Sequence, residues 1–172
     1  STHGRLVDNQ LSIQSFTGAL FDTQTKIDST QNLTITGEID FTKFFEPRYN
    51  LHAEGDDIFF RSLNGDIEGY GDLDVTVIGK DTLEINGTVA AKNGAIYIEF
   101  TGDEPVEFAE ANGRITTNYN IRFPIEDTFS IRNSQIDAKI SGELAISKQF
   151  DGEWNYSGEI EFIEGEIYYY VG

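Results

Sequence analysis

The sequence predicts an all-β chain that folds as a meandering sheet without crossover helices, and three observations support this class. Isoleucine occurs 20 times against 9 leucines, and 22 residues are aromatic. β-Branched and aromatic side chains fit a half-buried pleated sheet better than a helix. Apolar residues recur with period two, which indicates strands with one dry face and one wet face. Asn-Gly and Asp-Gly pairs lie between these runs and are typical of hairpin turns.

The alternating runs and the turn signals place the elements in order along the chain. The clearest runs cover residues 72–77, 96–100, 115–123, 136–140, 154–156 and 160–162. Turn signals lie at residues 54–57, 64–66, 79–81, 93–94, 101–103, 112–113 and 151–152. Short strands joined by tight turns predict a meander. Because no linker or change in composition divides the chain, we expect a single domain over residues 1–172.

Charge and composition exclude several classes of function. The chain has 12 basic and 30 acidic residues, a net charge of −18, which opposes nucleic acid and anionic membrane surfaces. It has no Cys, so it holds no disulfide framework or thiolate metal site, and its two histidines are too few for a histidine metal site. It also lacks Met and any secretory or membrane-spanning segment, so we expect a fragment of a longer chain.

The acidic residues do not form a convincing catalytic or metal site. Pairs such as Asp56/Asp57 and Asp103/Glu104 arise by chance among 30 carboxylates, and none lies in an apolar run that would raise a pKa as a glycosidase requires. Neither His3 nor His52 lies in a nucleophile-elbow context. The Asp-rich turns lack an EF-hand pattern, although calcium binding by them stays open. We therefore expect a protein that is not an enzyme, with no catalytic residues, cofactor or resident metal.

One local pattern repeats four times, written apolar-x-apolar-x-Gly-x-apolar. Its copies cover Leu33 to Ile39, Leu83 to Val89, Ala138 to Leu144 and Trp154 to Ile160. In each copy the Gly occupies a position where the alternation would otherwise place an apolar side chain. A missing side chain there permits a bend, a bulge or the close approach of another backbone. We consider two compatible interpretations: the Gly kinks a strand where the sheet folds, or it keeps an interior groove from filling.

The C-terminal part of the chain resembles the C-terminal conserved region of the TamB family, within the AsmA-like bridge proteins. The resemblance lies in two segments, residues 136–147 and residues 157–170, and the segment from Asn64 to Phe100 has the same style. It implies a long sheet curled into an open trough, a β-taco, with an apolar concave face. It also implies a periplasmic protein of a Gram-negative bacterium, anchored in the inner membrane outside this fragment. An Omp85-type outer-membrane barrel would be the partner, and outer-membrane protein strands or phospholipid acyl chains would be the clients.

The residues expected to line the trough are the apolar ones that the period-two alternation places on the same side of their strands. They are Leu73, Val75, Val77, Leu83, Ile85, Val89, Ile96, Ile98, Phe100, Tyr119, Ile121, Ile136, Ile140, Leu144, Ile146, Tyr156, Ile160 and Phe162. Period two fits the core of a closed β-sandwich equally well. The alternative function is therefore a secreted sandwich or solenoid module that binds sugar through exposed aromatic residues. A hydrolase with buried carboxylates is a weaker third reading.

Overall fold

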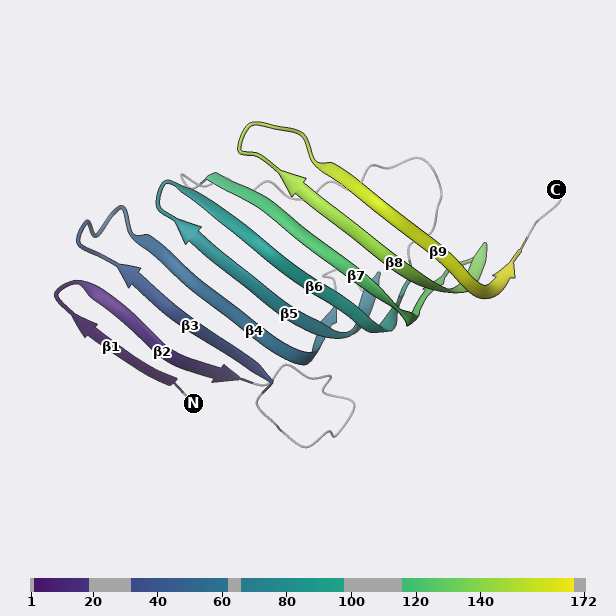
Figure 1. The fold of residues 1–172 in the computed structure, drawn as a ribbon, viewed down its shortest axis with the longest axis horizontal. Helices are drawn as coiled ribbons and strands as arrows, with labels where there is room; N and C mark the ends of the chain where they lie inside the picture. The colour runs from purple at the N-terminus through teal and green to yellow at the C-terminus, as the bar shows by residue number, and fades with distance from the viewer. Residues whose placement is uncertain (1, 19–31, 62–65, 98–115, 169–172) are drawn as a thin grey trace.

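The chain forms one open sheet in which the strands follow one another in sequence order (Figure 1). The computed structural model describes residues 2–18, 32–61, 66–97 and 116–168. Within these ranges nine strands pair edge to edge. They are β1 Thr2–Val7, β2 Gln10–Gly18, β3 Leu33–Asp40, β4 Arg48–Arg61, β5 Ile67–Gly79, β6 Thr82–Ile96, β7 Thr116–Arg132, β8 Ile136–Lys148 and β9 Asn155–Ile167.

This architecture confirms the all-β prediction and the meander. Every neighbouring pair is antiparallel except β6 and β7, which run parallel. A parallel pair needs a long connection, and residues 97–115 make it. The described ranges contain a single sheet, so the closed β-sandwich alternative is not the observed fold. No described helix has the length and apolar character needed to cross a membrane.

The two faces of the sheet differ sharply in chemistry, because paired residues of neighbouring strands share a face. One row crosses seven strands as Ile35, Ala53, Val75, Gly87, Ile121, Ile146 and Tyr156. We call the side that carries this row the apolar face. The opposite side, the polar face, carries the residues between them, such as Glu54, Asp74 and Asn86. The alternation seen in the sequence is thus a physical separation of the two sides.

A line of β-bulges crosses the sheet and bends it. Shifts of register lie after Gly55 in β4, after Tyr70 in β5, after Ala91 in β6, after Ile125 in β7 and after Lys139 in β8. These positions are neighbours across the ladder, so they form one continuous crease. Bulges increase twist and bend a strand. The strands turn sharply near their ends at this line (Figure 1).

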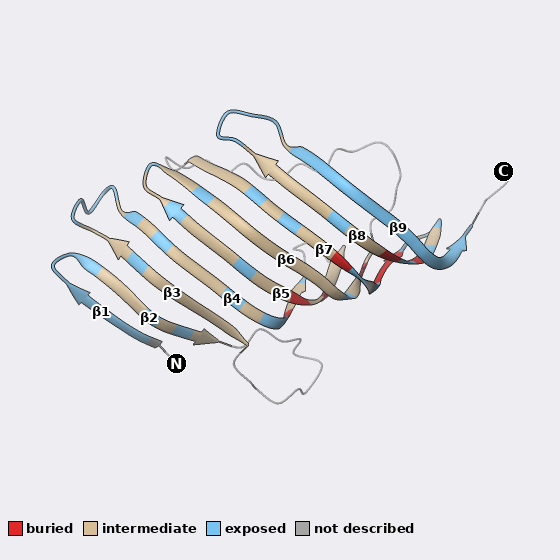
Figure 2. Ribbon diagram, viewed as in Figure 1, coloured by how far each residue is buried: buried red, intermediate tan, exposed pale blue. Residues whose placement is uncertain are grey.

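The crease places the core on the apolar face. Six of the seven buried apolar residues among the described ranges lie on that face, at or beyond the crease. Ile125, Phe129, Ile131 and Ile140 form the central cluster, and Ile140 has no exposed surface. Figure 2 shows that buried positions gather where the strands bend. The sheet therefore folds toward its apolar face and forms an open trough with a packed floor.

The glycines of the repeat occur where the backbone of a neighbouring strand approaches closely. Gly37, Gly87, Gly142 and Gly158 all have positive φ, between 128° and 156°. A Cβ at any of them would overlap the carbonyl oxygen of a residue on the adjacent strand, for example Glu159 beside Gly142. The expected close approach of another backbone is therefore observed at all four copies. Larger residues would be strained there both by φ and by contact.

Several predicted turns fall elsewhere. The signal at residues 79–81 does close the hairpin between β5 and β6, and that at 151–152 lies in the loop before β9. The predictions at 54–57 and 93–94 were wrong, because these residues lie inside β4 and β6 at the crease. Glycine and aspartate accept the conformations of a bulge as readily as those of a turn. The signals at 101–103 and 112–113 lie outside the described residues.

Candidate apolar binding face

All described members of the predicted lining set lie on the apolar face. The register carries Leu73, Val75 and Val77 of β5 across to Val89, Gly87 and Ile85 of β6. The same rows continue through β7 and β8 to Tyr156, Ile160 and Phe162 on β9. Ile98 and Phe100 lie outside the described residues. The structure thus brings sixteen of the eighteen residues together on one surface, and their role in binding stays a prediction.

Exposure varies along this surface. Ile140 is fully buried and packs in the floor beside Phe129. Most residues of the central strands, including Val75 and Ile121, are partly exposed. The face is open on the last strand, β9, where the exposed fraction is 58% for Tyr156 and 59% for Phe162. A ligand on this face would therefore contact the wall and β9, whereas Ile140 supports the floor from within.

The apolar face extends further than the sequence analysis predicted. Its N-terminal part carries Leu11, Ile13, Leu33, Ile35 and Leu51. The first copy of the glycine repeat, Leu33 to Ile39, was the sequence pattern that could have predicted this N-terminal part of the apolar face. Phe123 ends the alternating run at residues 115–123 but was not included in the predicted lining. Ile125 was missed because the bulge at residues 126–128 interrupts the alternation of β7 directly after it.

Ion pairs between neighbouring strands cover the polar face. Arg61 pairs with Glu68 at 2.5 Å, and Lys139 pairs with Glu164 at 2.5 Å. His52 contacts Asp74 through Nε2 at 2.9 Å, which accounts for this histidine without a catalytic role. Since most of these groups are well exposed, each pair contributes little on its own. Together they keep the polar face hydrated.

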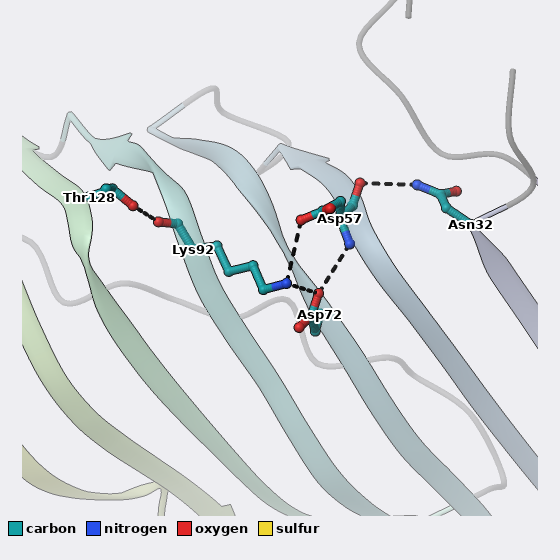
Figure 3. A network of polar contacts seen from close by, with 5 residues as sticks. All are labelled: Asn32, Asp57, Asp72, Lys92 and Thr128. Carbon is teal, nitrogen blue, oxygen red and sulfur yellow. Dashed lines mark hydrogen bonds and ion pairs between the residues drawn. The ribbon is translucent and has the colours of Figure 1, made fainter. Parts of the chain in front are cut away.

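A polar network joins four strands, β4 to β7, across the crease (Figure 3). Lys92, at the bulge of β6, contacts Asp72 of β5 at 2.7 Å and Asp57 of β4 at 3.5 Å. The Asp57 N–H donates to the Asp72 carboxylate, and Thr128 donates to the Lys92 carbonyl oxygen. The hydrogen bond to Asp72 is the main reason that the pKa of Lys92 is raised. The network therefore connects the bulges of β4, β6 and β7 through contacts on the polar face.

The polar face also carries acidic hollows, one of which is lined by Asn32, Glu54, Asp56, Asp72 and Asp74 among others. Within the described ranges, no group of three or more His, Asp or Glu side chains is arranged to hold a metal ion. Asp56 and Asp57, which the sequence analysis took for a chance pair, belong to the bulge of β4.

Aromatic side chains gather at the end of the trough wall opposite the crease. The rings of Tyr119 and Trp154 lie 5.4 Å apart, and those of Trp154 and Tyr156 lie 6.5 Å apart. The ammonium group of Lys148 lies 5.2 Å from the centre of the Trp154 ring. These four residues form the rim cluster. It adds polar donors to one end of an otherwise apolar surface.

Comparison with known proteins gives one match. The family model described as the TamB C-terminal domain matches residues 22–171. The match includes β3 and β4, where the sequence alone shows only a general likeness. Neither the search of curated proteins nor the search of solved structures returned a match.

Proposed function

This chain belongs to the TamB family, and from that premise we propose that its apolar face guides the acyl chains of phospholipids between membranes. The family is non-enzymatic and acts in outer-membrane biogenesis. Its members are periplasmic proteins anchored in the inner membrane. The proposal extends these family properties to a client, to an Omp85-type barrel as the partner, and to a periplasmic location for this chain.

One observation carries the proposal: a single face is apolar across nine strands and stays partly exposed. Ordinary soluble proteins bury such a surface, and large exposed apolar areas mark interaction sites. An acyl chain laid on this face would gain about 0.8 kcal/mol for each methylene removed from water. A dozen methylenes would therefore supply useful affinity without a polar contact. The direction of the trough, across the strands, allows further molecules to follow one another.

A second client is favoured by the state of β9. Every residue of this strand is exposed, and the described residues pair with only one of its edges. An unpaired strand edge can accept an extended peptide as an additional strand. A strand of an outer-membrane protein, with alternating apolar residues, would continue both the ladder and the apolar face.

Lipid extraction from the purified chain tests the main proposal. The variant Val75→Thr/Ile121→Thr introduces hydroxyl groups on the wall of the apolar face, with almost no change in volume at Val75 and the loss of one methyl-sized group at Ile121. The control Asp74→Thr/Asn120→Thr changes the preceding residues of the same two strands, on the polar face. We expect phospholipid to leave the wild-type chain and the control only on organic extraction, and the wall variant to carry less. A lipid-free wild-type chain that binds an outer-membrane β-strand peptide would favour the second client. Equal lipid loads on all three chains would contradict the apolar face as the lipid site.

A further inference from the structure

The rim cluster contains a charge in an unusual place. At the paired strand positions of the apolar face within the described ranges, Lys148 is the only charged residue. It pairs in register with Tyr119 and follows Ile146 and Leu144 on the same side of β8. A lysine at the end of an apolar wall keeps its ammonium group near water while its stem covers apolar surface.

Lys148 also differs from the other described lysines in its partners. Lys43, Lys80, Lys92 and Lys139 each lie within ion-pair distance of at least one carboxylate. Lys148 has an aromatic ring beside it instead, and within the described ranges no carboxylate pairs with it. An ammonium group holds three donors, and a ring face satisfies none of them fully. The cluster therefore offers a cation that can accept an anionic partner.

We propose that the rim cluster of Lys148, Tyr119, Trp154 and Tyr156 receives the phosphodiester headgroup of a phospholipid whose acyl chains lie on the apolar face. This inference rests on the proposed acyl-chain function and adds an orientation to it. Ammonium–phosphate hydrogen bonds are charge-assisted and stronger than neutral ones. Tyr and Trp rings combine an apolar body with a polar group, which suits the boundary between headgroup and acyl chain.

The charge distribution supports a phosphodiester at this place despite the net charge of −18. The acidic residues of β8 and β9, such as Glu143, Glu159 and Glu161, lie on the polar face. Repulsion through water falls off over about 8 Å at physiological ionic strength. The phosphate would thus face Lys148, with these paired carboxylates of β8 and β9 on the opposite side of the sheet.

The length of the wall fits an extended acyl chain. Six residues separate Lys148 from Gly142 at the crease, which corresponds to about 20 Å of strand. Ile146 and Leu144 lie along this path, and the packed floor at Ile140 ends it. The headgroup would lie at the open rim and the ends of the chains near the floor.

The chain contains a single tryptophan, and it is a member of the cluster, so its fluorescence reports on the site directly. The probes are phosphatidylglycerol molecules with bromine atoms either beside the headgroup or at the far ends of the acyl chains. Bromine quenches tryptophan only at short range. We expect headgroup-proximal bromine to quench Trp154 strongly and distal bromine to quench it weakly.

Two lysine variants on opposite faces of β8 give the matched comparison. Lys148→Gln should lower the affinity for phosphatidylglycerol about tenfold, or about 1.4 kcal/mol, and leave binding of diacylglycerol unchanged. Lys139→Gln, on the polar face, should change neither. Inorganic phosphate alone should fail to displace the lipid, because the acyl chains supply most of the affinity.

The outcomes separate this inference from the proposed function. If phosphatidylglycerol and diacylglycerol bind the wild type and Lys148→Gln equally, or if distal bromine quenches as well as proximal bromine, the headgroup site is wrong and the acyl-chain function stands. If neither lipid binds the wild type, the proposed function itself fails.

Discussion

Phe60 of β4 and Phe129 of β7 stack with ring centroids 6.4 Å apart, although β5 and β6 lie between them. In a flat sheet, residues three strands apart would be about 14 Å apart. Gly69 and Gly94 occupy the intervening places in the same row. A Cβ at Gly94 would lie 2.8 Å from Phe129 Cε2, and one at Gly69 would lie 3.1 Å from it. The two glycines make room for the ring, and the rings hold the folded part of the sheet closed.

Replacing Phe129 with Ala should therefore destabilise the chain strongly. The ring is 97% buried, since 3% of its residue surface is exposed, and its loss would leave a cavity at the crease. Truncations of this kind cost about 3–5 kcal/mol. Urea unfolding followed by circular dichroism would measure the change.

Phe45→Ala supplies the control for that measurement. Phe45 is 94% exposed, so its truncation should alter the free energy of unfolding by no more than about 0.5 kcal/mol. Similar losses in the two variants would mean that the packed floor does not stabilise the trough.

The sequence predicted the faces of the sheet better than its bends. Period two fixes which side chains share a face within a strand, so Leu73, Val75 and Val77 could be grouped without coordinates. The glycine repeat likewise indicated close backbone approach at Gly142. Neither signal depends on which strands become neighbours.

The position of the crease could not be predicted from the alternation within single strands. Asn93-Gly94 and Gly55-Asp56 have the composition of hairpin turns, and only the register with the adjacent strands reveals them as bulges. The parallel pairing of β6 with β7 is also a long-range property, which local alternation does not encode. The rim cluster was missed because Tyr119 lies beside Lys148 only through the long-range pairing of β7 with β8.

The glycine repeat gives a second prediction, on backbone conformation. Gly142 has φ of 138°, and a Cβ there would overlap the carbonyl oxygen of Glu159. Gly142→Ala should cost at least about 1–3 kcal/mol, the usual cost of a side chain in such a region. Gly152→Ala is the matched control, because its Cβ would meet nothing nearer than 3.4 Å. Comparable melting temperatures for the two variants would contradict this account of the repeat.

The polar network at the crease predicts a loss of stability at high pH. Asp72 hydrogen-bonds to Lys92 and raises the pKa of its ammonium group, with Asp57 adding to the effect. A raised lysine pKa means that the stabilising contribution is complete below the ordinary lysine pKa of about 10.4 and disappears as pH rises through the folded value.

Lys92→Met tests this prediction. The variant should melt below the wild type at neutral pH, because it leaves Asp57 and Asp72 facing each other without a cation. The difference should shrink once the pH passes the folded pKa of Lys92. A difference that persists unchanged into strong alkali would show that the side chain acts through packing alone.

The pairing of β9 with β8 should weaken in acid. Lys139 hydrogen-bonds to Glu164 across the two strands and lowers the pKa of its carboxyl group. A lowered carboxyl pKa gives a contribution that is complete above the ordinary glutamate value of about 4.3 and is lost as pH falls through the folded value. Glu164→Gln should therefore melt below the wild type at neutral pH and match it in acid. Glu161→Gln makes the same change of charge on the same face of β9, so the fall in melting temperature should be confined to the Glu164 variant. Thermal scans at neutral and acidic pH would measure the melting temperatures of both variants. Equal shifts would show that the effect comes from the net charge and not from the pair of Lys139 with Glu164.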